Sequence, residues 1–151
     1  MSEQAKAEQW QAFYSEELGK PLRFVRHDTN SHEDSDLEEL RDELGMEAYG
    51  RWWLLVEHLG KRRGHSYDVT RPNGWARLAR DLEFKNVEGC KRFVTWLVDH
   101  DLLHRGLAEE GRIVNERLCR DAEDYAREAA NGRIGAWARH QAPAEGPEGD
   151  A

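Results

Sequence analysis

The sequence predicts a mainly α-helical (α+β) domain: a winged helix-turn-helix with extra flanking helices and a small β-hairpin wing. Apolar residues recur at helical spacing along most of the chain. Two short helical stretches, 73–82 and 87–98, are separated by a tight turn, which is typical of a helix-turn-helix unit. Two apolar runs, 102–107 and 111–114, follow directly and indicate the strands of a hairpin around Ala108-Glu109-Glu110.

The length of 151 residues favours one folded domain. We expect an N-terminal helical extension over 1–21, the winged-helix domain over 22–120, a C-terminal helix with a Gly/Ala/Arg segment over 121–140, and a disordered tail over 141–151. Six Trp, four Tyr and four Phe are too many for a disordered acidic chain.

Several localisation and redox classes are disfavoured by the composition. No run of about 18 apolar residues is present, and the polar start does not resemble a signal peptide. The two cysteines, Cys90 and Cys119, match neither a disulfide framework nor a zinc-ligand spacing. We therefore expect a cytoplasmic protein without a membrane segment.

Three helices are predicted in the first half of the chain. The first covers about 5–18, and a short extended segment follows near Leu22 and Phe24. The second begins at Ser35, because Ser35 and Glu38 have the spacing of a capping box. The third covers about 46–62 and carries apolar residues around most of its surface, so we expect it to be the central core helix.

The second half has shorter elements. An extended link is predicted at Tyr67 and Val69, where apolar and polar residues alternate. The two helices of the helix-turn-helix unit have inward stripes of Trp75, Leu78, Ala79 and Leu82, and of Val87, Cys90, Phe93, Val94, Leu97 and Val98. A last helix is predicted over about 116–130.

The net charge of -8 is unevenly distributed. Residues 1–60 carry six basic and fourteen acidic side chains, whereas residues 61–120 carry thirteen basic and nine acidic ones. Residues 121–151 are again acidic, with three basic and seven acidic side chains. The basic block coincides with the predicted helix-turn-helix and wing, which favours an anionic partner for that part alone.

The outward face of the second helix of this unit has the residue types that read DNA. A helix in the major groove presents its N-terminal residues to base edges, and Arg, Lys and Asn make bidentate contacts there. We expect double-stranded DNA to contact this helix, the preceding helix and the wing through Lys85, Asn86, Lys91, Arg92, Thr95, Arg77, Arg80, Arg105 and Arg112, with support from the loop residues Lys61, Arg62, Arg63 and His65. The alternative is that these side chains form an ordinary solvated surface, interrupted by Glu88, Asp99, Glu109 and Glu110.

The sequence supports a metal site or a catalytic site less than it supports DNA binding. His100 and His104 are four residues apart, but the sequence names no further ligands for them, so we expect no metal site and no cofactor. No nucleophile elbow, Walker-type phosphate loop or dinucleotide-binding glycine motif is present, and adjacent carboxylates such as Glu38-Glu39 do not point to a common centre. We therefore do not expect an enzyme.

The order of residues resembles the N-terminal domain of DnaD-like phage and prophage replication proteins. The resemblance covers about residues 22–120 and is carried by Phe24-Val25-Arg26-His27-Asp28, Leu44-Gly45, Tyr49-Gly50-Arg51-Trp52 and Leu54-Leu55-Val56-Glu57. These motifs indicate the fold more than a chemical function, since Gly45 suits a helix end and Gly50 suits close helix packing. The segment from Ala130 to Arg139 also looks like the small-residue and Arg segment that often follows this domain.

The resemblance implies a winged helix that acts in replication initiation or as a replisome organiser, often self-associating and without catalytic residues. We expect a homo-oligomer, most simply a dimer, with 5–18 and 116–130 as the candidate dimer helices, and other replication proteins as further partners. This chain departs from the family at Asp36, where a Lys is common, and we do not expect residues 121–151 to form the helical C-terminal domain that follows in the family. The alternative function is an interaction module, in which the scaffold mediates assembly without binding DNA and the acidic segment from Glu33 to Glu47 contacts a basic partner.

Overall fold

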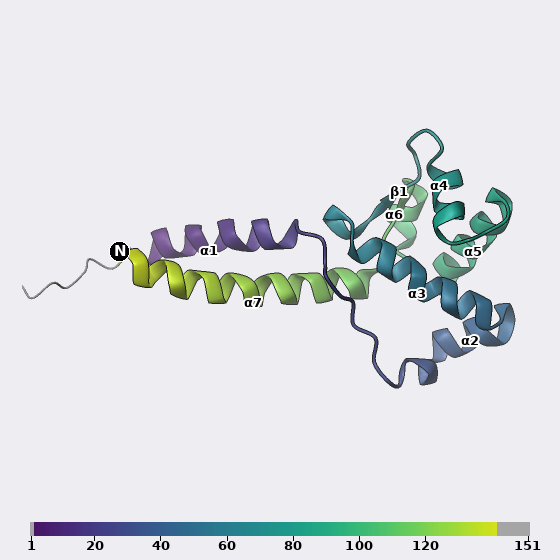
Figure 1. Ribbon diagram of the computed structural model, residues 1–151, viewed down its shortest axis with the longest axis horizontal. Coiled ribbons are helices and arrows are strands. Elements are labelled where there is room, and N and C mark those ends of the chain that lie inside the picture. The colour runs from purple at the N-terminus through teal and green to yellow at the C-terminus, as the bar shows by residue number, and fades with distance from the viewer. Residues whose placement is uncertain (1, 142–151) are drawn as a thin grey trace, which may run out of the picture. The chain divides into compact units, whose positions relative to one another are not determined.

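The computed structural model describes residues 2–141, which form seven α-helices, two short 3-10 helices and one two-stranded sheet (Figure 1). The helices are α1 (Glu3–Leu18), α2 (Ser35–Leu44), α3 (Met46–Gly60), α4 (Gly74–Asp81), α5 (Val87–Asp99), α6 (Arg105–Glu109) and α7 (Glu116–Gln141). The 3-10 helices are η1 (Ser31–Glu33) and η2 (Arg63–His65), and the strands are β1 (Tyr67–Asp68) and β2 (Arg112–Ile113). The mainly helical class is thus confirmed. Of the tail predicted over 141–151, Gln141 is the last residue of α7, and residues 142–151 lie outside the described residues.

The chain divides into two compact units. The larger one is Lys20–Asp121, and the smaller one comprises the described residues of 1–19 and 122–151. The hydrophobic core of the larger unit is formed by α2, α3, α4 and α5 together with both strands. Its fully enclosed side chains include Leu40, Leu55, Leu59, Leu78, Leu82, Cys90 and Leu97.

The predicted inward stripes of α4 and α5 are confirmed except at Trp75, Val87 and Val98, which are only partly buried and pack against the core. Leu78, Ala79 and Leu82 are buried at the α4 side, and Cys90, Phe93, Val94 and Leu97 are buried along α5. Gly74, the first residue of α4, lies against the backbone of the preceding loop. A Cβ on Gly74 would lie 2.5 Å from the carbonyl oxygen of Val69. Only glycine fits there without moving the backbone.

The start of α2 differs from the predicted capping box. The cap is Asp34, whose carboxylate accepts hydrogen bonds from the backbone N–H groups of Asp36 and Leu37 at 3.0 and 3.2 Å. Ser35 is already the first helical residue, so the capping box of Ser35 and Glu38 is wrong. Asp and Ser are equally good caps, and two candidates in a row cannot be ranked by spacing alone.

The glycines quoted for the family resemblance behave differently. Gly45 ends α2 with φ of 89°, in the region that favours glycine, as expected. Gly50, in contrast, lies on an exposed part of α3, and a Cβ added there would meet nothing within 4 Å. Close helix packing at Gly50 is therefore wrong.

The predicted hairpin wing is wrong. The segment Arg105–Glu109 is the short helix α6, whose first turn is capped by His104: the Nδ1 atom accepts the N–H of Leu107 at 3.1 Å. β2 pairs with β1 instead, antiparallel, with Tyr67 opposite Ile113 and Asp68 opposite Arg112. A short apolar run has too few residues for its period to separate helix from strand.

The last helix is longer than predicted. α7 continues through Gln141, so the Gly/Ala/Arg segment is helical despite Gly132 and Gly135. In the smaller unit, α1 and the second part of α7 run antiparallel (Figure 1). Ala122, Ala126, Ala130 and Ile134 are buried at every fourth position. Trp10 Nε1 donates a 2.7 Å hydrogen bond to Asn131 Oδ1, which fixes the register of the two helices.

No helix among residues 2–141 combines the length and the apolar character that crossing a lipid bilayer requires.

Candidate nucleic-acid interface

The candidate interface is the outer face of α4 and α5, both of which belong to the larger unit. The turn between the two helices is fixed by the backbone. Glu83 has φ of 60°, its N–H bonds the carbonyl of Arg80 at 3.0 Å, and the N–H of Phe84 bonds the carbonyl of Ala79 at 2.8 Å. This pair of bonds is a Schellman motif, which ends α4 and redirects the chain into α5.

All nine side chains predicted to contact DNA are exposed. Lys91, Arg92 and Thr95 lie on α5 opposite its buried face, and Arg77 and Arg80 lie on the outer face of α4. Lys85 and Asn86 occupy the turn, Arg105 begins α6, and Arg112 begins β2. The structure thus places seven of the nine on α4, α5 and the turn between them, and two on the segment where the wing was expected.

Five cations of this face have no acidic partner among the residues that the structure describes. In the part of the chain that the structure describes, none of Arg77, Arg80, Lys85, Lys91 and Arg92 has an ion-pair partner within 4 Å. Lys91 instead lies over the ring of Trp75, with its Nζ atom 5.5 Å from the ring centroid. We call these five residues the α4–α5 cation cluster.

Other predicted contacts have partners within the protein. Arg105 faces Asp99 at 3.7 Å, and Arg112 donates a 3.3 Å hydrogen bond to Ser66 Oγ. The Oδ1 atom of Asn86 caps α5 by accepting the N–H of Gly89 at 2.8 Å, so only its amide NH2 remains for a ligand. Thr95 is exposed on α5.

The loop before α4 contributes less positive surface than expected. Arg62 is 3.8 Å from Asp81 and stacks on the ring of Tyr67 at 3.9 Å. His65 is only 3% exposed, so its predicted support for DNA contact is wrong. Lys61 and Arg63 are exposed. Within this loop only His65 is buried, beside the buried Tyr67, and no local pattern in the sequence reports this burial.

Arg51 of α3 was not among the predicted site residues, yet it holds the turn in place. Its Nε and Nη2 atoms donate hydrogen bonds to the carbonyls of Leu82 and Glu83 at 3.0 and 3.1 Å. The guanidinium lies 4.2 Å from the ring centroid of Phe84 and pairs with Glu47 at 2.9 Å. The only sequence signal was the four-residue spacing of Glu47 and Arg51, which indicates a helix-surface pair and not a cap.

A groove lies beside the turn, with a volume of about 630 Å³. Its lining includes the aromatic residues Phe84, Phe93 and Trp96 and the charged residues Glu47, Arg51, Lys85 and Arg92. Two of these residues, Lys85 and Arg92, belong to the α4–α5 cation cluster.

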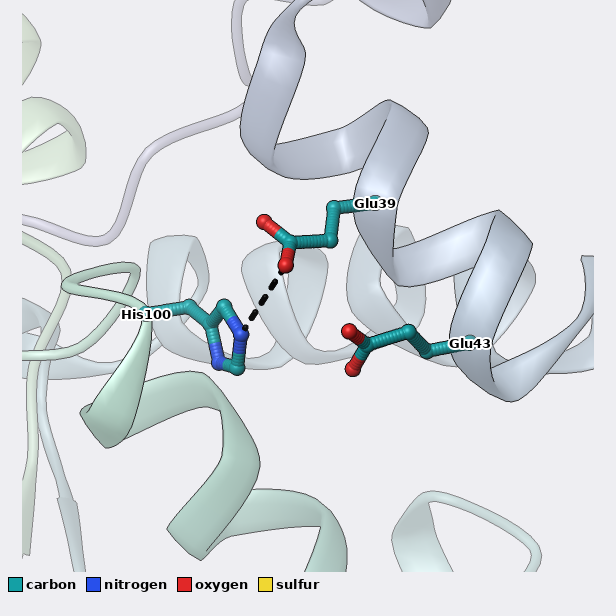
Figure 2. Close-up of side chains that lie close together, drawn as sticks. All are labelled: Glu39, Glu43 and His100. Carbon is teal, nitrogen blue, oxygen red and sulfur yellow. Dashed lines mark ion pairs between the residues drawn. The ribbon is translucent and has the colours of Figure 1, made fainter.

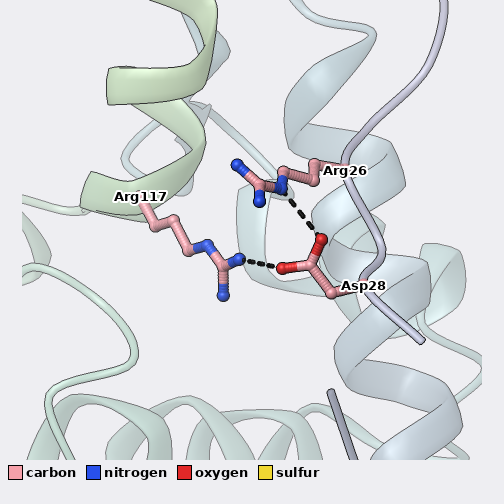
Figure 3. A network of polar contacts seen from close by, with 3 residues as sticks. All are labelled: Arg26, Asp28 and Arg117. Carbon is pink, nitrogen blue, oxygen red and sulfur yellow. Dashed lines mark hydrogen bonds and ion pairs between the residues drawn. The ribbon is translucent and has the colours of Figure 1, made fainter. Parts of the chain in front are cut away.

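The residues that carry the resemblance near position 27 have structural partners (Figure 3). Asp28 accepts hydrogen bonds from Arg26 at 2.9 Å and from Arg117, at the start of α7, at 2.8 Å. The hydrogen bond from Arg26 and then that from Arg117 hold the pKa of Asp28 below its ordinary value, against the opposing effect of desolvation. His27 stacks on Trp53 with ring centroids 3.6 Å apart. This motif therefore fastens the segment before α2 to the core.

The two histidines with helical spacing do not share a site. His100 faces Glu39 at 3.5 Å, whereas His104 faces Glu116 at 3.4 Å. α5 ends before both residues, so the four-residue spacing no longer places them on one helical face. Potential metal ligands gather only around His100, where Glu39 and Glu43 come close, among the residues described.

No protein-family model, curated protein or solved structure matches this chain.

Proposed function

We propose that the chain binds double-stranded DNA through the α4–α5 cation cluster, as a winged-helix type of protein. The observation that carries the proposal is that five exposed cations, on two adjacent helices and their turn, have no ion-pair partner among residues 2–141. Surface charges that serve only solubility are usually interspersed with opposite charges. An unneutralised cluster on a chain with a net charge of -8 favours a polyanion at this face.

α5 is the helix that enters the major groove in this proposal. Its exposed Lys91, Arg92 and Thr95 lie in the first three turns, which are the turns that approach base edges in helix-turn-helix proteins. Arg77 and Arg80 of α4 contact phosphates, which position the protein without reading sequence. The order α3, β1, α4, α5, β2 supports a winged-helix arrangement in which α6 and its following turn replace the hairpin.

The biological role that fits this binding is replication initiation or replisome organisation of the phage and prophage type. That role rests on the resemblance to the DnaD-like N-terminal domain, whose aromatic-His-Asp and Leu-Gly positions are Phe24-Val25-Arg26-His27-Asp28 and Leu44-Gly45. Self-association and contact with other replication proteins belong to the same proposal.

The test is a fluorescence-anisotropy titration of a random 25-base-pair duplex, in buffers of about 50 to 200 mM salt. We expect the logarithm of the observed binding constant to fall linearly with the logarithm of the salt concentration. Each phosphate contact contributes roughly 0.9 to the slope, so Arg77→Ala/Arg80→Ala should lower the slope by about 2.

The control variant is Lys6→Ala/Arg139→Ala, which removes two exposed cations of the smaller unit and leaves the overall charge equal to that of the test variant. We expect it to bind as the wild type does. Absence of binding at low salt, or equal losses in both double variants, would refute the proposed interface.

A second candidate is an interaction module, which a different surface favours. α2 exposes Glu38, Glu39, Asp42 and Glu43, and next to them Leu44 and Met46 are 41% and 66% exposed. Exposed apolar side chains rimmed by charge are typical of protein contacts. Light scattering that shows self-association in a chain without DNA affinity would favour this candidate.

A further inference from the structure

Two helices bring three potential metal ligands together at one edge of the larger unit. Glu39 and Glu43 are four residues apart on α2, so both carboxylates lie on the same helical face. His100 is the residue that ends α5, and its ring points at this face (Figure 2). One ligand atom of each residue lies within 4.8 Å of the other two.

The ring of His100 is held in the tautomer that a metal ligand needs. Its Nδ1 atom is 2.8 Å from the carbonyl oxygen of Trp96. A carbonyl can only accept, so Nδ1 carries the proton and donates, and the lone pair of the neutral ring is on Nε2. Nε2 is the atom that faces Glu39 Oε1, at 3.5 Å. Histidines that bind metals typically donate their other ring N–H to a carbonyl or carboxylate in this way.

The second carboxylate is also oriented by a neighbour. Trp96 Nε1 donates a 2.6 Å hydrogen bond to Glu43 Oε2. The indole of Trp96 stacks on the His100 ring, with centroids 3.6 Å apart and planes 13° apart. One residue outside the cluster therefore fixes both the imidazole and a carboxylate, through two different hydrogen bonds and a ring contact.

We propose that Glu39, Glu43 and His100 form a binding site for a divalent transition-metal ion, with Zn²⁺ as its test ion. One imidazole and two carboxylates are ligands that Zn²⁺ accepts, and three protein ligands leave a fourth position for water. The site is independent of DNA binding, because none of its residues belongs to the α4–α5 cation cluster.

The local charge favours a cation at this place. Two carboxylates four residues apart on a helix repel each other, and a bound cation removes that repulsion. Zn²⁺ ligands lie about 2.0 to 2.2 Å from the ion. Glu39 and Glu43 are exposed, so their carboxylates have room to move toward a bound ion.

The test is isothermal titration calorimetry of the full chain with Zn²⁺ at neutral pH. We expect one saturable site per chain, and we expect Glu39→Gln/Glu43→Gln to weaken binding by more than tenfold. Both substitutions keep the side-chain shape and an acceptor for Trp96, and circular dichroism confirms that the variant is folded.

Two further variants separate a built site from loose surface binding. His32→Asn/Glu33→Gln removes an exposed pair 3.8 Å apart on another element and should leave the affinity unchanged. Trp96→Phe keeps the ring stack but loses the N–H donor, so the affinity should fall about tenfold at unchanged stoichiometry, as is usual for residues that orient ligands. Absence of a saturable site, or the same loss in the His32→Asn/Glu33→Gln variant as in Glu39→Gln/Glu43→Gln, overturns the proposal and leaves Glu39 and His100 as an ordinary ion pair.

Discussion

His65 is a polar side chain that the fold buries although one of its ring nitrogens has no hydrogen-bond partner in the described structure. Its side chain is 3% exposed, and its Nε2 atom is buried without a hydrogen-bond partner in the described structure. Burial lowers the pKa of His65 below the ordinary 6.5, against the opposing effect of a backbone hydrogen bond with Lys20. The folded state therefore favours the neutral form of this imidazole.

The pH dependence that follows has a definite sign. As pH falls through about 6.5, the unfolded chain gains a proton at His65 before the folded chain does, so the native state loses stability. His65→Asn removes the titrating group and tolerates the positive φ of 52° at this position. We expect urea unfolding at pH 8 and pH 5.5 to show a smaller pH-dependent loss in the variant than in the wild type. Equal losses in the two proteins would contradict this.

Arg51 of α3 stabilises the end of α4 through hydrogen bonds to the carbonyls of Leu82 and Glu83. The side chain is 20% exposed, yet its guanidinium satisfies two carbonyls at the end of α4 and stacks on Phe84. Cations at helix C-termini satisfy free carbonyls and complement the helix dipole. α3 therefore sets the angle at which the helix-turn-helix presents its cations.

At the scale of elements, α4 and α5 end in the same way. Each closes with a Schellman motif, and each has a non-glycine residue in the left-handed position: Glu83 after α4 and Asp101 after α5, with φ of 60° and 59°. Glycine adopts this conformation without the steric cost that Glu and Asp bear. Both helix ends therefore hold residues that local backbone preference disfavours.

We expect Glu83→Gly to raise the free energy of unfolding by about 0.5 to 1 kcal/mol, because it relieves the cost of positive φ. The matched control is Glu88→Gly, in the first turn of α5, where the backbone is helical and glycine should lower the free energy of unfolding by about 1 kcal/mol. Urea denaturation measures both. A loss of stability in both variants would mean that Glu83 makes a contact worth more than its backbone strain.

At the scale of the whole molecule, core and candidate interface belong to the same unit. Every residue of the hydrophobic core cluster and all five residues of the α4–α5 cation cluster lie within Lys20–Asp121. The smaller unit has two helices, and α1 has no fully buried side chain. Folding and DNA binding should therefore depend on the larger unit, and self-association on α1 with α7.

We expect the fragment 20–121 to unfold cooperatively and to bind duplex DNA with the salt slope of the full chain. Light scattering should give the mass of a monomer for the fragment and of a dimer for the full chain, because two helices alone leave outward faces without neighbours. A dimeric fragment would place the dimer contact on the larger unit instead.

Much of the helical architecture could be predicted from the sequence. The stripes of α4 and α5, the helix end at Gly45 and the separation of helices by short turns all depend on local periodicity and local backbone preference. The pairing of the strands could not be predicted, since β2 pairs with β1 across 45 intervening positions between Tyr67 and Ile113, and α6 takes the place of the strand that was expected to neighbour β2. A contact between segments that far apart leaves no local pattern.

The sequence by itself determined the helices, their buried faces and the identity of the exposed cations on α4 and α5, because these follow from the spacing of apolar and charged residues along a helix. Only the tertiary structure decided which cations stay unpaired, that Arg51 fixes the turn, that His65 is buried and that Glu39, Glu43 and His100 meet. Each of these depends on distances between elements remote in the chain, and such distances are set by how the helices pack.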